Sequence, residues 1–227
     1  MIKACVFDAY GTLFDVGAAA RTAAGEPGAG GWAAKWPQIA ADWRRKQLEY
    51  TWLRAVAGAH ADFWQVTQDA LDWALEQAGL EAPELRARLL QLYWQLAAFP
   101  EVPAMLAALA AQGQRLAILS NGSPGMLEGA VRSAGLSARF EALFSVESVG
   151  VFKPDRRVYD LVGSGLNLAP REVLFVSSNG WDACAGAAYG FASVWVNREA
   201  APRERLFGSP QHVLADLGAL PALVESL

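Results

Sequence analysis

Residues 3–15 read KACVFDAYGTLFD, and this stretch decides the fold. Residues 3–7 are a short, mostly apolar run rich in strand-forming residues, which predicts a buried β-strand. Asp8 follows the run directly, and Gly11 permits a tight turn just after it. An acid placed immediately past a buried strand is open to a ligand yet held by rigid backbone, as a nucleophile requires. The plainer interpretation is that Asp8 merely caps the next turn of the chain, but the functional interpretation is favoured.

Comparable apolar runs recur along the chain, at 115–119, 143–146, 173–176 and 193–196. Helix-like stretches separate them, at 101–112, 124–134, 155–164 and 180–189. Strands that alternate with helices of this length predict an α/β fold with a Rossmann-like, doubly wound parallel sheet. Ligands bind beyond the carboxyl ends of the strands in such sheets, where Asp8, Ser120 and Ser177 lie. We expect the residues after Asn197 to form a last helix that closes the sheet.

The segment 17–98 has a different character. It begins with the Gly/Ala-rich stretch GAAARTAAGEPGAGG and continues with helical periodicity and no convincing strand. We therefore predict a helical-bundle cap subdomain at 17–98, inserted into a catalytic core formed by 1–16 and 99–227. Within the cap, Arg44, Leu48 and Trp52 are spaced four apart and share one helical face. That face presents a cation beside apolar surface.

The composition excludes several classes of protein. The 227 residues are 53% hydrophobic and 19% charged, which is typical of a compact globular protein. A net charge of −4 without a basic stripe argues against nucleic-acid binding, and no apolar run is long enough to span a membrane. Cys5 and Cys184 form no close-spaced pair, which favours buried thiols in a reducing cytoplasm. The chain enters a strand at once, so we expect no secretory signal, and two histidines argue against a His-rich metal site.

Three further motifs place polar side chains at or near predicted strand ends. Ser120-Asn121-Gly122 offers a hydroxyl, an amide and backbone N–H groups to an anion, although Ser-Asn-Gly is also an ordinary turn. Phe152-Lys153-Pro154-Asp155, with Tyr159 six residues after the lysine, offers an ammonium that would keep a carboxylate ionised. The plainer interpretation of Lys153 is a solvated surface residue.

The last motif is Ser177-Ser178-Asn179-Gly180-Trp181-Asp182. Polar side chains follow a predicted strand here, and an aromatic residue and an acid open the next helix. Asp182 alone could be a first-turn residue favoured by the helix dipole. The order of all four motifs along one chain nevertheless favours a functional interpretation.

In this order and spacing the motifs resemble the haloacid dehalogenase superfamily, and specifically its L-2-haloacid dehalogenases. The resemblance runs over nearly the whole chain and includes the cap segment WRRKQLEYTWLR at 43–54. It implies hydrolytic dehalogenation of (S)-2-haloalkanoic acids to (R)-2-hydroxyalkanoic acids, with inversion, through an ester on Asp8. It also implies a homodimer that uses no metal and no other cofactor.

The same resemblance implies roles for individual residues. Asp8 is implied to be the nucleophile, with its carboxylate held by Thr12, Lys153, Ser177 and Asn179. The substrate carboxylate is implied to bind Ser120, helped by backbone amides near Ala9 and Tyr10. The departing halide is implied to meet Arg44, Asn121 and Trp181. An apolar pocket for the alkyl group is implied to be lined by Tyr10, Leu48, Phe63 and Trp181. Tyr159 would support Lys153, and Asp182 would position or activate water.

Most members of this superfamily are Mg²⁺-dependent phosphatases, so the fold alone does not decide the reaction. The phosphatase pattern is Asp-x-Asp, in which the second acid protonates the leaving group, but Tyr10 stands there in this sequence. A halide is a very weak base and needs no proton, so only dehalogenation tolerates this change. Ser177-Ser178 also replaces the Gly-Asp usual in phosphatases, which removes a hard Mg²⁺ ligand. We prefer the dehalogenase, with a phosphatase or a non-catalytic binding protein as alternatives.

Overall fold

The computed structural model describes all residues from 1 to 227. Six strands form one parallel sheet: β1 (Ala4–Phe7), β2 (Arg115–Ser120), β3 (Ala142–Ser145), β4 (Val173–Ser177), β5 (Ala192–Val196) and β6 (His212–Leu214). Their order is β3-β2-β1-β4-β5-β6. After β1, the chain adds β2 and β3 on one side of it. It then returns to add β4, β5 and β6 on the other side. The order therefore reverses between β1 and β4, where α/β sheets of this kind bind ligands.

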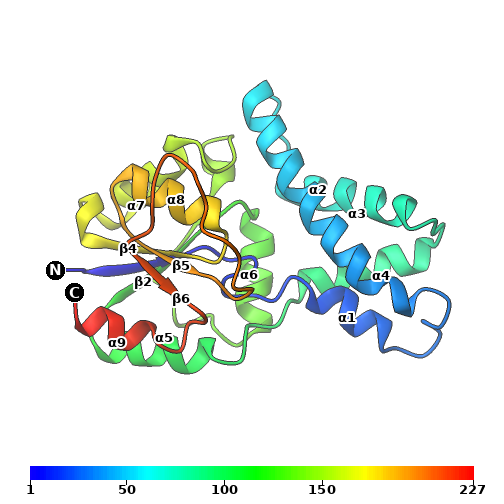
Figure 1. Ribbon diagram of the computed structural model, residues 1–227, viewed down its shortest axis with the longest axis horizontal. Coiled ribbons are helices and arrows are strands. Elements are labelled where there is room, and N and C mark those ends of the chain that lie inside the picture. Colours follow the sequence, from blue (N-terminus) through cyan, green and yellow to red (C-terminus); the bar gives the residue numbers. More distant parts are fainter.

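Helices cover both faces of the sheet (Figure 1). One face carries α7 (Arg156–Leu166) and α8 (Gly180–Tyr189), and the other carries α5 (Val102–Ala111) and α9 (Leu220–Glu225). The remaining core helix, α6 (Pro124–Ser133), packs on β3 and against the cap. Every residue of β1 and β4 is buried, which explains why these strands read as continuous apolar runs.

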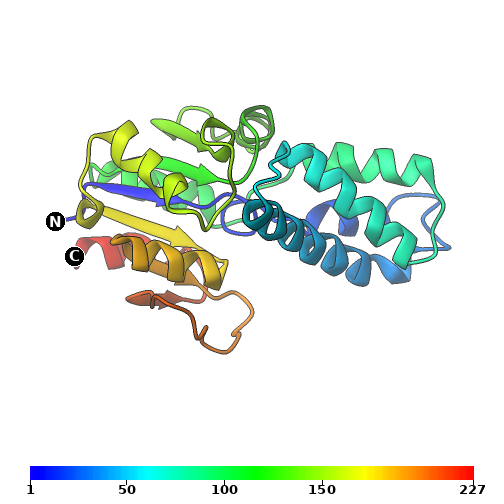
Figure 2. The ribbon, with the colours of Figure 1, turned by 90° about the horizontal axis from the view of Figure 1, so that it is seen from above.

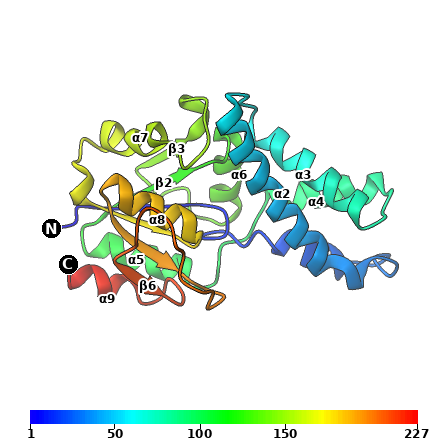
Figure 3. The ribbon, with the colours of Figure 1, turned by 45° about the horizontal axis from the view of Figure 1, so that its top comes forward.

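The cap consists of α1 (Ala18–Ala24), α2 (Trp36–Ala57), α3 (Phe63–Gln77) and α4 (Pro83–Trp94). These helices pack on one another beyond the carboxyl ends of the strands (Figure 2). The long α2 runs obliquely along the cap, with one end near the core (Figure 3). One continuous cluster of 55 buried apolar residues includes members of both cap and core. The boundaries 1–16, 99–227 and 17–98 stay a prediction.

The α/β class, with a doubly wound parallel sheet and helical cap, is confirmed. Element boundaries differ from the sequence expectation by a residue or two. The expectation for the chain after Asn197 was incomplete, because β6 precedes α9 there. This edge strand has only three residues, none fully buried, so it carries no apolar run. Three short 3-10 turns complete the fold, at Ala33–Lys35, Val146–Ser148 and Pro170–Glu172. No helix is both long and apolar enough to cross a membrane.

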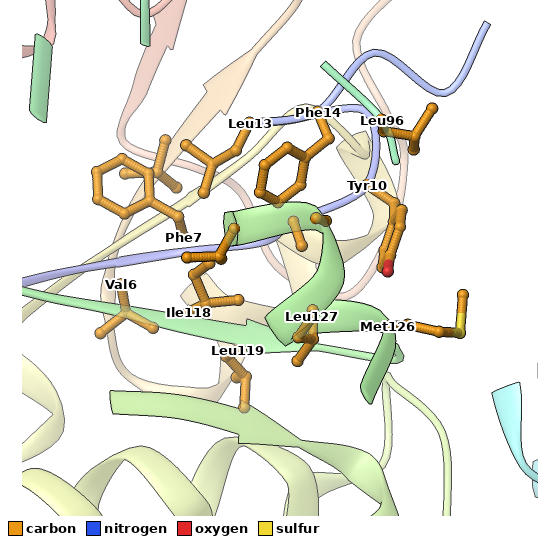
Figure 4. Packing of buried hydrophobic residues seen from close by; sticks show 14 of the residues in the cluster. Val6, Phe7, Tyr10, Leu13, Phe14, Leu96, Ile118, Leu119, Met126 and Leu127 are labelled. Atoms are coloured by element: carbon orange, nitrogen blue, oxygen red, sulfur yellow. The ribbon is translucent and has the colours of Figure 1, made fainter. Parts of the chain in front are cut away.

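The loop after β1 is anchored by its own apolar side chains. Leu13 and Phe14 are fully buried and lie on the same side of the sheet as Phe7 (Figure 4). Their backbone N–H groups both donate to the carbonyl of Ala9. Gly11 has a φ of +88°, a left-handed conformation that other residues adopt with strain. Burial of each large side chain stabilises the loop by about 1.5–3 kcal/mol, so the segment that carries Asp8 is rigid.

Candidate active site

Asp8 continues the line of β1 and lies at the point where the strand order reverses. Its N–H donates to the carbonyl of Val176 at 2.9 Å, which extends the ladder between β1 and β4. Oδ2 accepts hydrogen bonds from the Thr12 hydroxyl at 3.0 Å and from Nδ2 of Asn179 at 2.9 Å. Oδ1 accepts from Nζ of Lys153 at 3.1 Å. All three partners are donors, the arrangement that a buried carboxylate anion needs.

Lys153 is 1% exposed, so the surface interpretation of this residue is wrong. Its ammonium bridges Oδ1 of Asp8 and Oδ2 of Asp182, the latter at 2.9 Å. Burial by itself would lower the pKa of Lys153, but the charges of Asp182 and Asp8 outweigh it and hold the pKa above its ordinary value. The lysine therefore stays cationic at neutral pH.

Asp182 is fully buried and both of its carboxylate oxygens are occupied. Oδ1 accepts the Tyr159 hydroxyl at 2.7 Å, and Oδ2 accepts Lys153. Burial raises the pKa of Asp182, and Lys153 opposes that rise. Tyr159 was expected to support Lys153, and its phenol reaches the lysine through Asp182, to which it donates. Asp182 itself lies behind Lys153 and does not line the cavity described below.

The expectation that Ser177 holds the Asp8 carboxylate also needs correction. The Ser177 hydroxyl accepts the N–H of Asn179 at 3.2 Å and makes no hydrogen bond to Asp8. The neighbouring Ser178 has the closer connection, since its N–H donates to Oγ1 of Thr12 at 2.8 Å. The sequence reasoning missed Ser178 as a site residue. Its place in the last motif was the only signal that could have found it. Ser178 binds Thr12 through its backbone N–H, and nearly every residue type has a backbone N–H, so the residue type does not indicate this contact.

A cavity of about 10 Å³ lies over Asp8, between cap and core. Ten residues line it, all of them expected from the sequence: Asp8, Tyr10, Arg44, Leu48, Phe63, Ser120, Asn121, Lys153, Asn179 and Trp181. Arg44, Leu48 and Phe63 come from the cap helices, and the others come from the core. This volume has room for about one water molecule, so the side chains around Asp8 are closely packed and exclude bulk water.

Several side chains around the cavity have hydrogen-bond donors with no protein acceptor. Oγ of Ser120 accepts the N–H of Gly122 at 3.0 Å, which leaves its hydroxyl proton free to donate. Oδ1 of Asn121 accepts the backbone N–H of Lys153 at 3.0 Å, so the Asn121 amide nitrogen is available. Nε1 of Trp181 is buried without a partner. Unpaired buried donors are costly, and a bound anion would satisfy them.

The backbone beside Asp8 adds donors of the same kind. The N–H groups of Ala9 and Tyr10 make no hydrogen bond to a protein acceptor, although both residues are buried. Most buried backbone N–H groups are paired in folded proteins. Two unpaired ones in a row next to a carboxylate therefore indicate a place for a ligand oxygen.

Arg44 extends from α2 of the cap to the core. Its Nη2 donates to the carbonyl of Tyr10 at 3.1 Å and to Oδ1 of Asn179 at 3.0 Å. Its Nη1 donates to Oε1 of Gln47 at 3.1 Å. The amide of Asn179 thus connects the guanidinium to Asp8. The sequence reasoning missed Gln47, and the three-residue spacing from Arg44 was the one signal that could have found it.

Aromatic rings form the apolar wall of the cavity. The ring of Tyr10 stacks on that of Tyr93, with 5.7 Å between centroids and 11° between planes, and lies 5.8 Å from Phe63. Trp181 meets Trp52 edge to face at 5.4 Å. Burial raises the pKa of Tyr10 well above its ordinary value, and the nearby Tyr93 and Asp8 add to the rise. Tyr10 is therefore a neutral phenol.

No group of three or more His, Cys, Asp and Glu side chains in the molecule is arranged to hold a metal ion. The two carboxylates nearest the cavity, Asp8 and Asp182, are joined instead by the ammonium of Lys153.

Comparison with known proteins places this site in a family. A family model described as haloacid dehalogenase-like hydrolase matches residues 2–190. (S)-2-haloacid dehalogenase 1 of Pseudomonas sp. (strain CBS-3) is 45% identical over 227 residues, which are 100% of this chain and 98% of that protein. The structure of L-2-haloacid dehalogenase from Xanthobacter autotrophicus is 42% identical, covers 100% of both chains and has a TM-score of 0.89. A second structure from that organism, with chloropropionic acid covalently bound, has a TM-score of 0.87. The chain therefore belongs to the haloacid dehalogenase-like hydrolases, in the family of the (S)-2-haloacid dehalogenases.

Proposed function

We propose that the protein hydrolyses (S)-2-haloalkanoic acids to (R)-2-hydroxyalkanoic acids and halide. One observation carries the proposal: a buried carboxylate faces a small cavity whose remaining unpaired polar groups are donors. The substrate binds as a carboxylate anion, and its reaction releases a halide, which is a second anion. Hydrogen-bond donors are therefore needed both at the substrate carboxylate and at the departing halide. The covalently bound chloropropionic acid in the Xanthobacter autotrophicus relative supports the same class of substrate.

Binding uses the two groups of donors separately. The substrate carboxylate accepts from the Ser120 hydroxyl and from the backbone N–H groups of Ala9 and Tyr10. Its alkyl group packs on Tyr10, Leu48, Phe63 and Trp181, which line the cavity. This placement leaves the second carbon of the substrate facing Asp8.

In the first step, a carboxylate oxygen of Asp8 attacks the second carbon from the side opposite the halogen, at about 3–3.5 Å. A carbon–oxygen bond forms, and the carbon–halogen bond breaks with its electron pair leaving on the halide. The configuration inverts. Arg44, the amide nitrogen of Asn121 and the indole of Trp181 stabilise the developing charge in a site that excludes bulk water.

In the second step, water attacks the side-chain carbonyl carbon of Asp8, and the ester bond from that carbon to oxygen breaks. The hydroxy acid keeps the inverted configuration and carries away an oxygen of Asp8. Lys153 and Asn179 stabilise the transient oxyanion as they do the resting carboxylate. One proton of the attacking water goes to the departing alkoxide oxygen and becomes the hydroxyl proton of the product, and the other is released to water as the Asp8 carboxylate is restored. Asp182 keeps Lys153 in place as the ammonium throughout.

The phosphatase alternative meets two obstacles. Its alkoxide leaving group needs an acid at the position of Tyr10, whose raised pKa makes the phenol a poor proton donor. A magnesium ion between Asp8 and Asp182 would also meet the ammonium of Lys153, which already joins them. We therefore propose a metal-independent reaction.

The test is halide release from L- and D-2-chloropropionate with excess chelator. We expect turnover of the L isomer only, unaffected by chelation, and none for Asp8→Asn. Asp15→Asn is a matched control, because Asp15 lies in the same loop but pairs with Arg21 at the surface. Single turnover in heavy-oxygen water should label Asp8. Label that goes directly into the product, or magnesium-dependent turnover of a generic phosphoester, would contradict the proposal.

We also propose a cytoplasmic homodimer. Three neighbouring apolar side chains near the end of α2 are exposed, namely Trp52, Leu53 and Val56, and the last is 90% exposed. Contact with a second copy would remove this apolar surface from water. Cys5 and Cys184 are free and buried, which fits a reducing compartment. Light scattering of the purified protein should give twice the mass of the chain, and a monomer would contradict the dimer.

A further inference from the structure

Gln47 is a buried amide at the place where three cap helices meet. It lies on α2, is 1% exposed, and has hydrogen-bond partners on each of the three. Nε2 donates to Oγ1 of Thr67 on α3 at 2.7 Å, and the hydroxyl of Tyr93 on α4 lies 3.1 Å from the same nitrogen. Oε1 accepts from Nη1 of Arg44 on its own helix at 3.1 Å. Every polar atom of this side chain is therefore paired.

The partners allow only one orientation of the amide. The Thr67 hydroxyl has a single proton, and it donates that proton to the carbonyl of Phe63 at 2.7 Å. Toward Gln47 it can only accept, so the amide nitrogen must face Thr67 and the amide oxygen must face Arg44. A flipped amide would set its NH₂ group against the guanidinium and its oxygen against a lone pair of Thr67.

The oxygen of Gln47 completes the set of acceptors on Arg44. The carbonyl of Tyr10 and Oδ1 of Asn179, both from the core, hold Nη2, and Gln47 holds Nη1 from the cap. Three fixed acceptors define the plane of the guanidinium. They engage three of its five N–H groups, and the side chain of Arg44 lines the cavity.

We infer that Gln47 is a positioning residue that orients Arg44 toward the departing halide and thereby sets the affinity of the site for halide. The inference rests on the proposed function, because it takes the ligand of Arg44 to be the halide. The neutral amide matters: a carboxylate at this position would bind Arg44 more tightly but cancel much of its positive field. An apolar side chain would leave Arg44, Thr67 and the Tyr93 hydroxyl without their partner.

The experiment compares Gln47→Leu and Gln47→Glu with the wild-type enzyme, and uses Gln38→Leu as a matched control. Gln38 also lies on α2 and donates to a residue of its own helix, Asp42, away from the cavity. Bromide is the probe, measured as a product inhibitor and, without turnover, by its saturable effect on the melting temperature. Circular dichroism checks that each variant is folded.

Loss of a hydrogen bond to a charged group predicts a fall in kcat of about 10- to 100-fold for Gln47→Leu. We expect the inhibition constant for bromide to rise by about tenfold or more in both Gln47 variants, with little change in KM, because the Ser120 end of the cavity is unaltered. Thr67→Val, which frees the amide to flip, should give a smaller change that is not additive with Gln47→Leu. Gln38→Leu should match the wild type.

A merely structural role would give a different pattern. The melting temperature would fall while kcat and bromide binding stayed at wild-type values, and that result would overturn the inference. If the wild-type enzyme released no halide from any haloacid, the proposed function would fail. The melting experiment would still report whether Gln47 governs bromide binding, so the two failures are distinguishable.

Discussion

Replacing Lys153 by methionine keeps an unbranched side chain of similar length but removes the cation between two buried carboxylates. The ammonium lies 3.1 Å from Asp8 and 2.9 Å from Asp182. At an effective dielectric constant of about 20, each pair attracts by about 5–6 kcal/mol. The loss of hydration of the three groups offsets much of this attraction. Removal of one partner of a buried pair accordingly costs about 3–5 kcal/mol.

We expect the free energy of unfolding of Lys153→Met at neutral pH to fall by about 3–5 kcal/mol, measured by urea denaturation. Halide release should be lost, because the nucleophile loses the donor on Oδ1. Two facing carboxylates would hold a proton more tightly in the folded than in the unfolded state, so the variant should regain stability as the pH falls. Lys3→Met is the control, since Lys3 is 56% exposed and pairs with Glu172 at the surface.

A surface pair of this kind contributes about 0–1 kcal/mol. If Lys153→Met lost no more stability than Lys3→Met, the reasoning from buried charge would be refuted. The same holds if its stability did not increase in acid.

Three further predictions follow from the same contacts. Thr12→Val removes the hydroxyl that donates to Asp8, so kcat for halide release should fall about 10- to 100-fold with unchanged circular dichroism; full activity would contradict the role of this donor. Tyr159→Phe leaves one oxygen of buried Asp182 without a donor, and urea denaturation should show a loss of about 1–3 kcal/mol. The pKa of Lys153 is raised above 10.5, so its contribution to stability is present below that pH and is lost as the pH rises through the folded-state pKa. The difference in melting temperature between the wild type and Lys153→Met should therefore persist across the alkaline range until above 10.5, and a difference that disappears well below that pH would count against a buried ammonium.

Sequence alone determined the α/β class and most of the elements. A strand buried on both faces must be apolar throughout, so β1 and β4 are visible as runs of strand-forming residues. The carboxyl ends of parallel strands meet at one edge, which is why Asp8, Ser120 and Ser177 could be placed together before their contacts were known. Resemblance to a family then named the ten residues that line the cavity.

Tertiary structure alone decided which atoms pair. Tyr159 reaches Lys153 only through Asp182, and Ser177 binds backbone instead of Asp8, because hydrogen-bond partners depend on where a rotamer points across the fold. The sequence does not predict the contacts of Gln47, because only the packing of α3 and α4 brings Thr67 and Tyr93 beside it. The edge strand β6 has too few buried residues to leave a periodic signal, since only pairing with β5 defines it.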